Sequence, residues 1–115
     1  MKILLAEDET EILEFFREYL CDCGYEVIAV DDGEKAIAAI EADDTIHALI
    51  TDANLPLVKG PAIAVTFHKK FANAPICVIS GHLDADNLFQ TEAKDIKVTI
   101  KEKPFPRFTY AEAME

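Results

Sequence analysis

The sequence contains no tryptophan and has only four glycines and five prolines in 115 residues. Without Gly-rich or Pro-rich tracts it does not resemble a linker or a low-complexity segment, and half of its residues are hydrophobic, as in globular proteins. A chain of this length forms one compact core and is too short for two ordinary domains. We therefore expect a single domain spanning residues 1–115.

The sequence also lacks any long hydrophobic run. No apolar stretch approaches the roughly 20 residues of a transmembrane helix. Met1 and Lys2 lead straight into a strand-like segment, where a secretory leader would carry a longer apolar region. We expect a cytoplasmic protein that does not interact with a membrane.

Basic residues are scarce. Eleven lysines and arginines stand against 22 acidic residues, which gives a formal charge of −11 at pH 7. Nucleic acid phosphates repel a chain with this charge, so we do not expect direct nucleic acid binding.

Cysteine is also sparse, and its number, three, is odd. Cys21 and Cys23 are two positions apart on a predicted helix and therefore point to different sides. We interpret the cysteines as reduced thiols. The alternative, a metal site at Cys-Asp-Cys, lacks a second pair of ligands.

The sequence does contain a regular alternation of strand-like and helical patterns. Apolar runs predict strands at residues 2–6, 26–30, 48–51, 76–79 and 98–101, and several of these runs are continuous, as in strands covered on both faces. Helical spacing and end signals predict helices at residues 10–23, around 36–40, at 62–71 and at 84–93. A fifth helix would have to fit into the ten residues after Phe105.

This alternation predicts an α/β fold, a (βα)5 doubly wound parallel sheet with helices on both faces and right-handed crossovers. The five-stranded version, known as flavodoxin-like, commonly has the strand order 2-1-3-4-5. Its functional crevice lies at the carboxyl ends of strands 1 and 3.

Polar residues follow the predicted strands. Glu7 and Asp8 come after the first strand, Asp52 after the third, Ser80 after the fourth and Lys103 after the fifth. Three carboxylates at one edge of a sheet repel one another and need a cation if all are to stay ionised. Mg²⁺ is the natural candidate, because it prefers oxygen ligands and combines one or two carboxylates with a phosphate.

Each of these residues also has an ordinary explanation. Glu7 and Asp8 precede a helix, where acidic residues act as caps and complement the helix dipole. Asp52 suits a turn, Ser80 a loop start, and Lys103 a solvated surface. Their joint position at the carboxyl ends of four strands favours a common site.

With these motifs in place, the sequence resembles the CheY-like receiver domains of two-component response regulators along nearly the whole chain. KILLAEDE is similar to the first strand and acidic pair of that family, and DANLPLVKG to its Asp-x-x-Met/Leu-Pro-x-x-x-Gly stretch. VISGH is similar to its fourth strand with a terminal Ser or Thr, and KPF to its Lys-Pro motif.

The resemblance implies a role for each matching residue. Asp52 would be the phosphoacceptor, and Mg²⁺ would be held by Glu7, Asp8, Asp52 and the backbone carbonyl of Asn54. Ser80 would sense the phosphoryl group. A carboxylate is chemically suited to this role, because it can attack phosphorus as a nucleophile and form an acyl phosphate.

On the fifth strand and beyond it, the resemblance implies that Lys103 contacts the phosphoryl group and that a cis peptide precedes Pro104. One position departs from the family. Ile100 stands three residues before Lys103, where members often carry a Tyr or Phe ring that moves on activation. We expect Ile100 to pack simply against the fourth strand.

The leading hypothesis is a receiver domain that takes a phosphoryl group from a sensor histidine kinase or a histidine phosphotransfer protein. It would then switch conformation and control a downstream protein, as a monomer or weak dimer. Beyond self-catalysed phosphorylation and dephosphorylation it would not be an enzyme. The chain is either a stand-alone protein or a domain of a larger regulator or hybrid kinase, and the sequence leaves both open.

Two alternatives remain. A small phosphatase of the haloacid dehalogenase type would use Asp52 as nucleophile, but those enzymes need a second aspartate where this chain has Asn54, and the chain has no room for a cap domain. A degenerate receiver would bind partners without phosphorylation, which Ile100 slightly favours and the intact acidic set disfavours. A minority interpretation gives His82 a role in tuning hydrolysis of the phosphorylated form.

Overall fold

The computed structural model describes residues 1–52, 55, 57–80 and 99–102, with the backbone alone for Ser80 and residues 99–102. In chain order the elements are β1 (Lys2–Ala6), α1 (Thr10–Asp22), β2 (Glu26–Val30), α2 (Gly33–Ala42), β3 (Ala48–Asp52), α3 (Gly60–Lys70), β4 (Ile76–Ser80) and β5 (Thr99–Glu102). The bounds agree with the predicted ones to within two residues, except that α2 begins three residues before the stretch around 36–40 that the sequence predicted. The helix predicted at residues 84–93 and the fifth helix lie outside the described residues.

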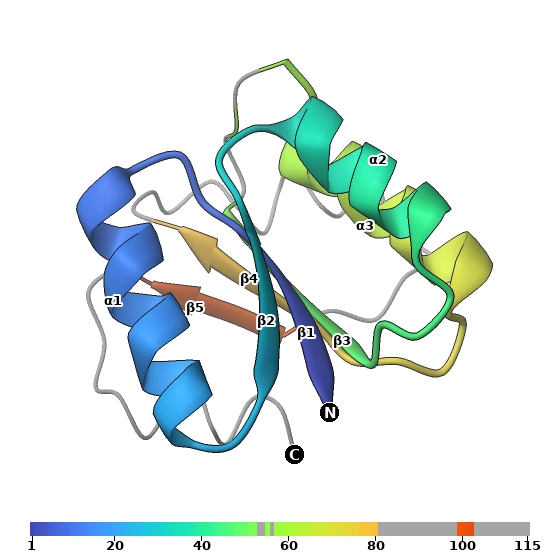
Figure 1. The fold of residues 1–115 in the computed structure, drawn as a ribbon. Coiled ribbons are helices and arrows are strands. Elements are labelled where there is room, and N and C mark those ends of the chain that lie inside the picture. The colour runs from blue at the N-terminus through green and yellow to red at the C-terminus, as the bar shows by residue number, and fades with distance from the viewer. Residues whose placement is uncertain (53–54, 56, 81–98, 103–115) are drawn as a thin grey trace.

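The strands form one parallel sheet in the order β2-β1-β3-β4-β5, which is the predicted order. Figure 1 shows α1 on one face of this sheet and α2 with α3 on the other. The fold is therefore the predicted doubly wound α/β arrangement, and its carboxyl edge is the edge at which β1 and β3 end. Among the described helices, none has both the length and the apolar composition needed to cross a membrane.

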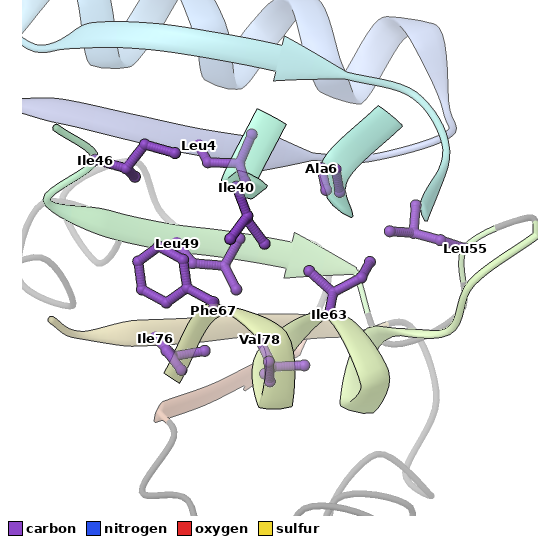
Figure 2. Packing of buried hydrophobic residues seen from close by; sticks show 12 residues of the cluster. Leu4, Ala6, Ile40, Ile46, Leu49, Leu55, Ile63, Phe67, Ile76 and Val78 are labelled. Carbon is purple, nitrogen blue, oxygen red and sulfur yellow. The ribbon is translucent and has the colours of Figure 1, made fainter. Parts of the chain in front are cut away.

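The hydrophobic core has two halves, one on each face of the sheet. Alternate residues of a strand point to opposite faces, so Leu4 packs towards α2 and α3 while Ile3 and Leu5 pack towards α1. Figure 2 shows the α2–α3 half, where Ile40, Ile63 and other buried side chains gather over the sheet. Both faces of the central strands are covered, which explains the continuously apolar runs in the sequence.

Local signals set the ends of the helices. The side chain of Asp32 accepts a hydrogen bond of 2.8 Å from the backbone N–H of Lys35 and so caps the start of α2. Pro61 lies in the first turn of α3, where its missing N–H costs nothing. Gly24 follows α1 with φ of +95°, a backbone conformation that glycine adopts without strain.

Ion pairs and hydrogen bonds connect the elements at the amino end of the sheet. The Nζ of Lys2 donates to Asp43 and to the hydroxyl of Thr45, each at 2.8 Å, and lies 3.3 Å from Glu26. The pKa of Asp43 lies well below its usual range. The largest cause is the hydrogen bond from Lys2, and the hydrogen bonds from the hydroxyl and the backbone N–H of Thr45 lower it further. This network joins β1 to the segment between α2 and β3.

Lys70, the last residue of α3, extends this arrangement to the end of α2. Its Nζ donates to the backbone carbonyls of Ile40, Glu41 and Asp43 at 2.6, 3.2 and 3.2 Å, and it pairs with Asp44 at 2.8 Å. A cation at this place satisfies carbonyls that the helix itself leaves without donors. The ends of α2 and α3 are thereby fixed to each other.

Candidate functional site

Two acidic segments meet at the carboxyl edge of the sheet. Glu7 and Asp8 directly follow β1, and Asp52 is the last residue of β3. The parallel register places Ala6 opposite Thr51, so the residues that follow each of them lie on neighbouring strands at the same edge. The sheet topology thus brings Asp52 together with two adjacent carboxylates that precede it by more than 40 positions in the sequence.

One carboxylate oxygen from each of Glu7, Asp8 and Asp52 lies within 4.8 Å of the other two. Glu7 is completely buried and Asp52 is 7% exposed, whereas Asp8 is exposed to solvent. The cluster is therefore buried on the side of Glu7 and Asp52 and accessible to solvent on the side of Asp8. A small ion or a phosphoryl group can approach it from that side.

The chemistry of this cluster fits a hard divalent cation. Its donors are all carboxylate oxygens, the ligand type that Mg²⁺ prefers, with no thiolate or imidazole among them. Three like charges at this separation repel one another, and a bound cation would remove that repulsion. The described residues thus fit a magnesium site, in which Glu7, Asp8 and Asp52 would be the protein ligands.

Hydrogen bonds hold the cluster in place. The backbone N–H of Glu7 donates to the carbonyl of Val30 at 3.0 Å, which ties the end of β1 to the end of β2. The Oε1 of Glu7 accepts a bond of 3.1 Å from the backbone N–H of Glu9. The hydroxyl of buried Thr51 donates to the backbone carbonyl of Asp52 at 3.0 Å.

Thr51 was missed by the sequence analysis, which treated residues 48–51 simply as a strand. The signal was present, because Thr51 is the only hydroxyl residue in an otherwise apolar run directly before Asp52. A buried hydroxyl normally has a hydrogen-bond partner, and here that partner is the main chain of the proposed phosphoacceptor.

The arrangement can support nucleophilic chemistry at Asp52. Its side chain lies at the end of a buried central strand that is paired on both sides, and it keeps a small exposed area. A fixed carboxylate with an open approach can attack an incoming phosphorus atom. The neighbouring carboxylates would hold the cation that screens the phosphoryl charge.

The backbone of β4 and β5 places two further predicted residues. Asp52 is opposite Ile79 in the register, so Ser80 follows one position beyond this pair at the same edge. Ile100 is opposite Val78 on the adjacent strand. At the level of the main chain, β4 therefore ends beside the acidic cluster, as the sequence predicted.

The remaining predicted site residues, Asn54, Lys103 and Pro104, lie outside the described residues, as does His82. Their assigned roles therefore stay predictions that follow from the motifs.

The comparison with protein families identifies the class. The family model described as response regulator receiver domain matches residues 3–113. The chain therefore belongs to the response regulator receiver domain family, in agreement with the motifs of the sequence and with the acidic cluster at the carboxyl edge of the sheet.

Solved structures support the same class. A response regulator receiver protein from Sinorhizobium medicae is 31% identical with a TM-score of 0.89, over 99% of this chain and 90% of that protein. The receiver domain of the hybrid histidine kinase CckA is 32% identical with a TM-score of 0.77, over 97% and 94% of the two chains. Vibrio cholerae CheY4 shares the fold, with a TM-score of 0.82 at 24% identity and coverage of 96% and 92%.

Curated relatives are longer proteins. The putative two-component response regulator ARR21 of Arabidopsis thaliana is 30% identical over 81 residues, which is 70% of this chain and 13% of that protein. The transcriptional regulatory protein DctD of Pseudomonas aeruginosa is 26% identical over 105 residues, or 91% of this chain and 22% of that protein. The chain thus spans less than a quarter of the length of either protein.

Proposed function

We propose that the protein is a phosphorylation-dependent switch in which Asp52 accepts a phosphoryl group in a reaction that depends on Mg²⁺. One observation carries the proposal: Glu7, Asp8 and Asp52 converge within 4.8 Å at the carboxyl edge of the sheet, in a chain of the receiver domain family. The donor is a phosphohistidine of a sensor histidine kinase or a histidine phosphotransfer protein.

In the proposed transfer, a carboxylate oxygen of Asp52 attacks the phosphorus of the donor, and the bond between phosphorus and the histidine nitrogen breaks. The imidazole leaves in its neutral form because its other ring nitrogen carries a proton, and Asp52 becomes an acyl phosphate. Later attack of water on phosphorus releases inorganic phosphate and restores the carboxylate. Mg²⁺ held by Glu7, Asp8, Asp52 and the Asn54 carbonyl would neutralise charge on the transferring group.

Around the phosphoryl group, Ser80 and Lys103 complete the proposed switch. The hydroxyl of Ser80 donates a hydrogen bond to a phosphoryl oxygen, and the ammonium of Lys103 makes a charge-assisted contact on another side. These contacts exist only in the phosphorylated state, so they shift the conformational equilibrium towards it. The resulting surface controls a downstream protein. In this proposal the protein is a cytoplasmic signalling switch, and its own chemistry is limited to phosphorylation and dephosphorylation of Asp52.

Intact mass spectrometry after incubation with Mg²⁺ and acetyl phosphate tests the proposal. Wild-type protein should gain one phosphate that is lost again on standing and is absent when Mg²⁺ is chelated. Asp52→Asn, which keeps the shape but removes the nucleophile, should gain none. Labelling of Asp52→Asn at the wild-type rate would show that another residue is the principal acceptor.

The labelling experiment, together with a turnover assay on p-nitrophenyl phosphate, separates the two alternatives. A phosphatase would release phosphate in many turnovers from a general substrate such as p-nitrophenyl phosphate. A degenerate receiver would gain no phosphate under any of these conditions. A stoichiometric, labile adduct without such turnover is the result that we expect.

A further inference from the structure

Gly33, the first residue of α2, lies unusually close to Val58, which precedes α3. A Cβ atom placed on Gly33 would lie 2.1 Å from the carbonyl oxygen of Val58 and 2.5 Å from its Cβ. Both distances are far below normal van der Waals contact, and one of these atoms belongs to the backbone. The two segments can therefore touch in this way only because residue 33 has no side chain.

Val58 cannot simply move aside, because its segment is anchored at both ends. Leu55 is 1% exposed, and Figure 2 shows it pointing towards Ala6 and Ile63 in the α2–α3 half of the core. Gly60, which begins α3, is buried as well. Leu57, between them, has φ of +73°, a conformation that side-chain-bearing residues seldom adopt.

On its other side, Gly33 is connected to the end of β2, which is hydrogen-bonded to Glu7. The cap of α2 by Asp32 fixes its first turn, and the strand just before it, β2, accepts the bond from the N–H of Glu7 at the carbonyl of Val30. Gly33 thus lies between the end of β2, which is bonded to Glu7, and Val58, which precedes α3. Figure 1 shows the start of α2 beside the residues that lead directly into α3.

We propose that Gly33 is a positioning residue for the phosphorylation site: its contact with Val58 sets how closely the start of α2 approaches the residues before α3, and thereby the position of Asp52 relative to Glu7 and Asp8. This inference rests on the proposed function. Any side chain at residue 33 pushes the two segments apart, and the movement is transmitted to the carboxylates that must share one cation. Misplacement of reacting groups by about 1 Å can lower a rate by up to roughly a hundredfold.

A purely structural glycine would behave differently, and the chain offers a matched control. Gly24 also resists substitution, because its φ is +95°, but a Cβ there would meet no atom within 4 Å. It lies at the end of α1, at the opposite edge of the sheet from the acidic cluster. Gly24→Ala should therefore destabilise the fold through backbone strain alone and leave the site geometry unchanged.

The test measures Mg²⁺ affinity by calorimetric titration and the initial rate of labelling by acetyl phosphate, together with stability in urea. Relative to wild type, Gly33→Ala should bind Mg²⁺ several-fold more weakly and be labelled about tenfold more slowly at saturating Mg²⁺. Gly24→Ala should stay within about twofold in both. Equal affinities and rates in the two variants would overturn the inference, whatever their stabilities.

Val58→Gly serves as a second variant, in case Gly33→Ala does not fold. It leaves Gly33 in place but removes the Cβ against which Gly33 packs and loosens the segment, so both Mg²⁺ affinity and labelling rate should fall in the same direction. Wild-type values for Val58→Gly would contradict the inference. Absence of any labelling in wild type would instead refute the proposed function, and the Mg²⁺ affinities would still test the role of Gly33.

Discussion

The charged residues at the two ends of the sheet are arranged in opposite ways: opposite charges are paired at one end, and like charges are gathered at the other. At the amino end, Lys2 is matched with Asp43 at 2.8 Å, and Lys70 is matched with Asp44 and the last carbonyls of α2. At the carboxyl end, Glu7, Asp8 and Asp52 bring three charges of the same sign within 4.8 Å. The first arrangement stabilises the fold, whereas the second costs stability and creates a place for a cation and a phosphoryl group.

The largest effect is expected from Asp8→Ala, which removes the exposed carboxylate of the cluster. Mg²⁺ affinity should fall by at least tenfold, because one of three charged ligands is lost while the buried pair stays in place. Titration followed by calorimetry measures the change. Glu11→Ala, an exposed acid in the first turn of α1, is the control. An unchanged Mg²⁺ affinity in Asp8→Ala would show that the acidic cluster is not the metal site.

A second prediction concerns the cost of the cluster. In the absence of Mg²⁺, Asp52→Asn should raise the free energy of unfolding by about 1 to 2 kcal/mol, because it removes one of three mutually repelling charges. Addition of Mg²⁺ should reduce this advantage, since the ion stabilises wild type more than the variant. Urea unfolding with and without Mg²⁺ measures both. A destabilised Asp52→Asn would mean that the carboxyl end is not under electrostatic strain.

The sequence predicts the ends of the strands well, but it does not predict the contacts between distant segments. The ends of β1 and β3 could be predicted, because an apolar run that stops at Glu7-Asp8 or at Asp52 fixes both the strand and the position of the carboxylates. Parallel pairing then brings these ends to one edge. The site follows from strand order, and strand order follows from the alternation of elements.

Contacts between distant segments could not be predicted in this way. Nothing in the local sequence around Gly33 says that its partner is Val58, because that approach depends on how α2 lies against the segment before α3. The same holds for Lys70, whose side chain reaches back about 30 positions to the end of α2. The roles of Asn54, Lys103 and Pro104 remain predictions from their motifs.

A smaller effect is expected at the amino end when pH is lowered. The pKa of Asp43 lies well below its ordinary value of 3.8, chiefly because of the hydrogen bond from Lys2. A depressed pKa in the folded state stabilises the fold above the unfolded value and loses this contribution as pH falls through the folded value. The stability difference between wild type and Asp43→Asn should therefore be constant at neutral pH and shrink below about pH 4.

Urea unfolding at a series of pH values measures this difference. Lys2→Met provides the matched comparison, because it removes the main cause of the pKa shift. The stability difference between Lys2→Met and wild type should shrink in the same pH window. A difference between wild type and Asp43→Asn that stayed constant well below pH 4 would contradict the assignment.

The smallest effect is expected in β5. Ile100 is β-branched, stiff at χ1 and without a polar tip, so phosphorylation should change this strand less than the segment after β4. Hydrogen exchange with and without beryllofluoride compares the amides of residues 99–102 with those of residues 80–84. Changes of equal size in both segments would show that the missing aromatic ring at Ile100 has no consequence.

In the proposed function, the carboxyl end of the sheet binds Mg²⁺ and a phosphoryl group as one unit. Calorimetric titration of Mg²⁺ in the presence and absence of beryllofluoride tests it most directly, with Asp52→Asn in parallel. We expect beryllofluoride to tighten Mg²⁺ binding by at least about tenfold in wild type, since each ligand supplies contacts for the other, and to have no effect in Asp52→Asn. An Mg²⁺ affinity that beryllofluoride leaves unchanged in wild type would contradict it.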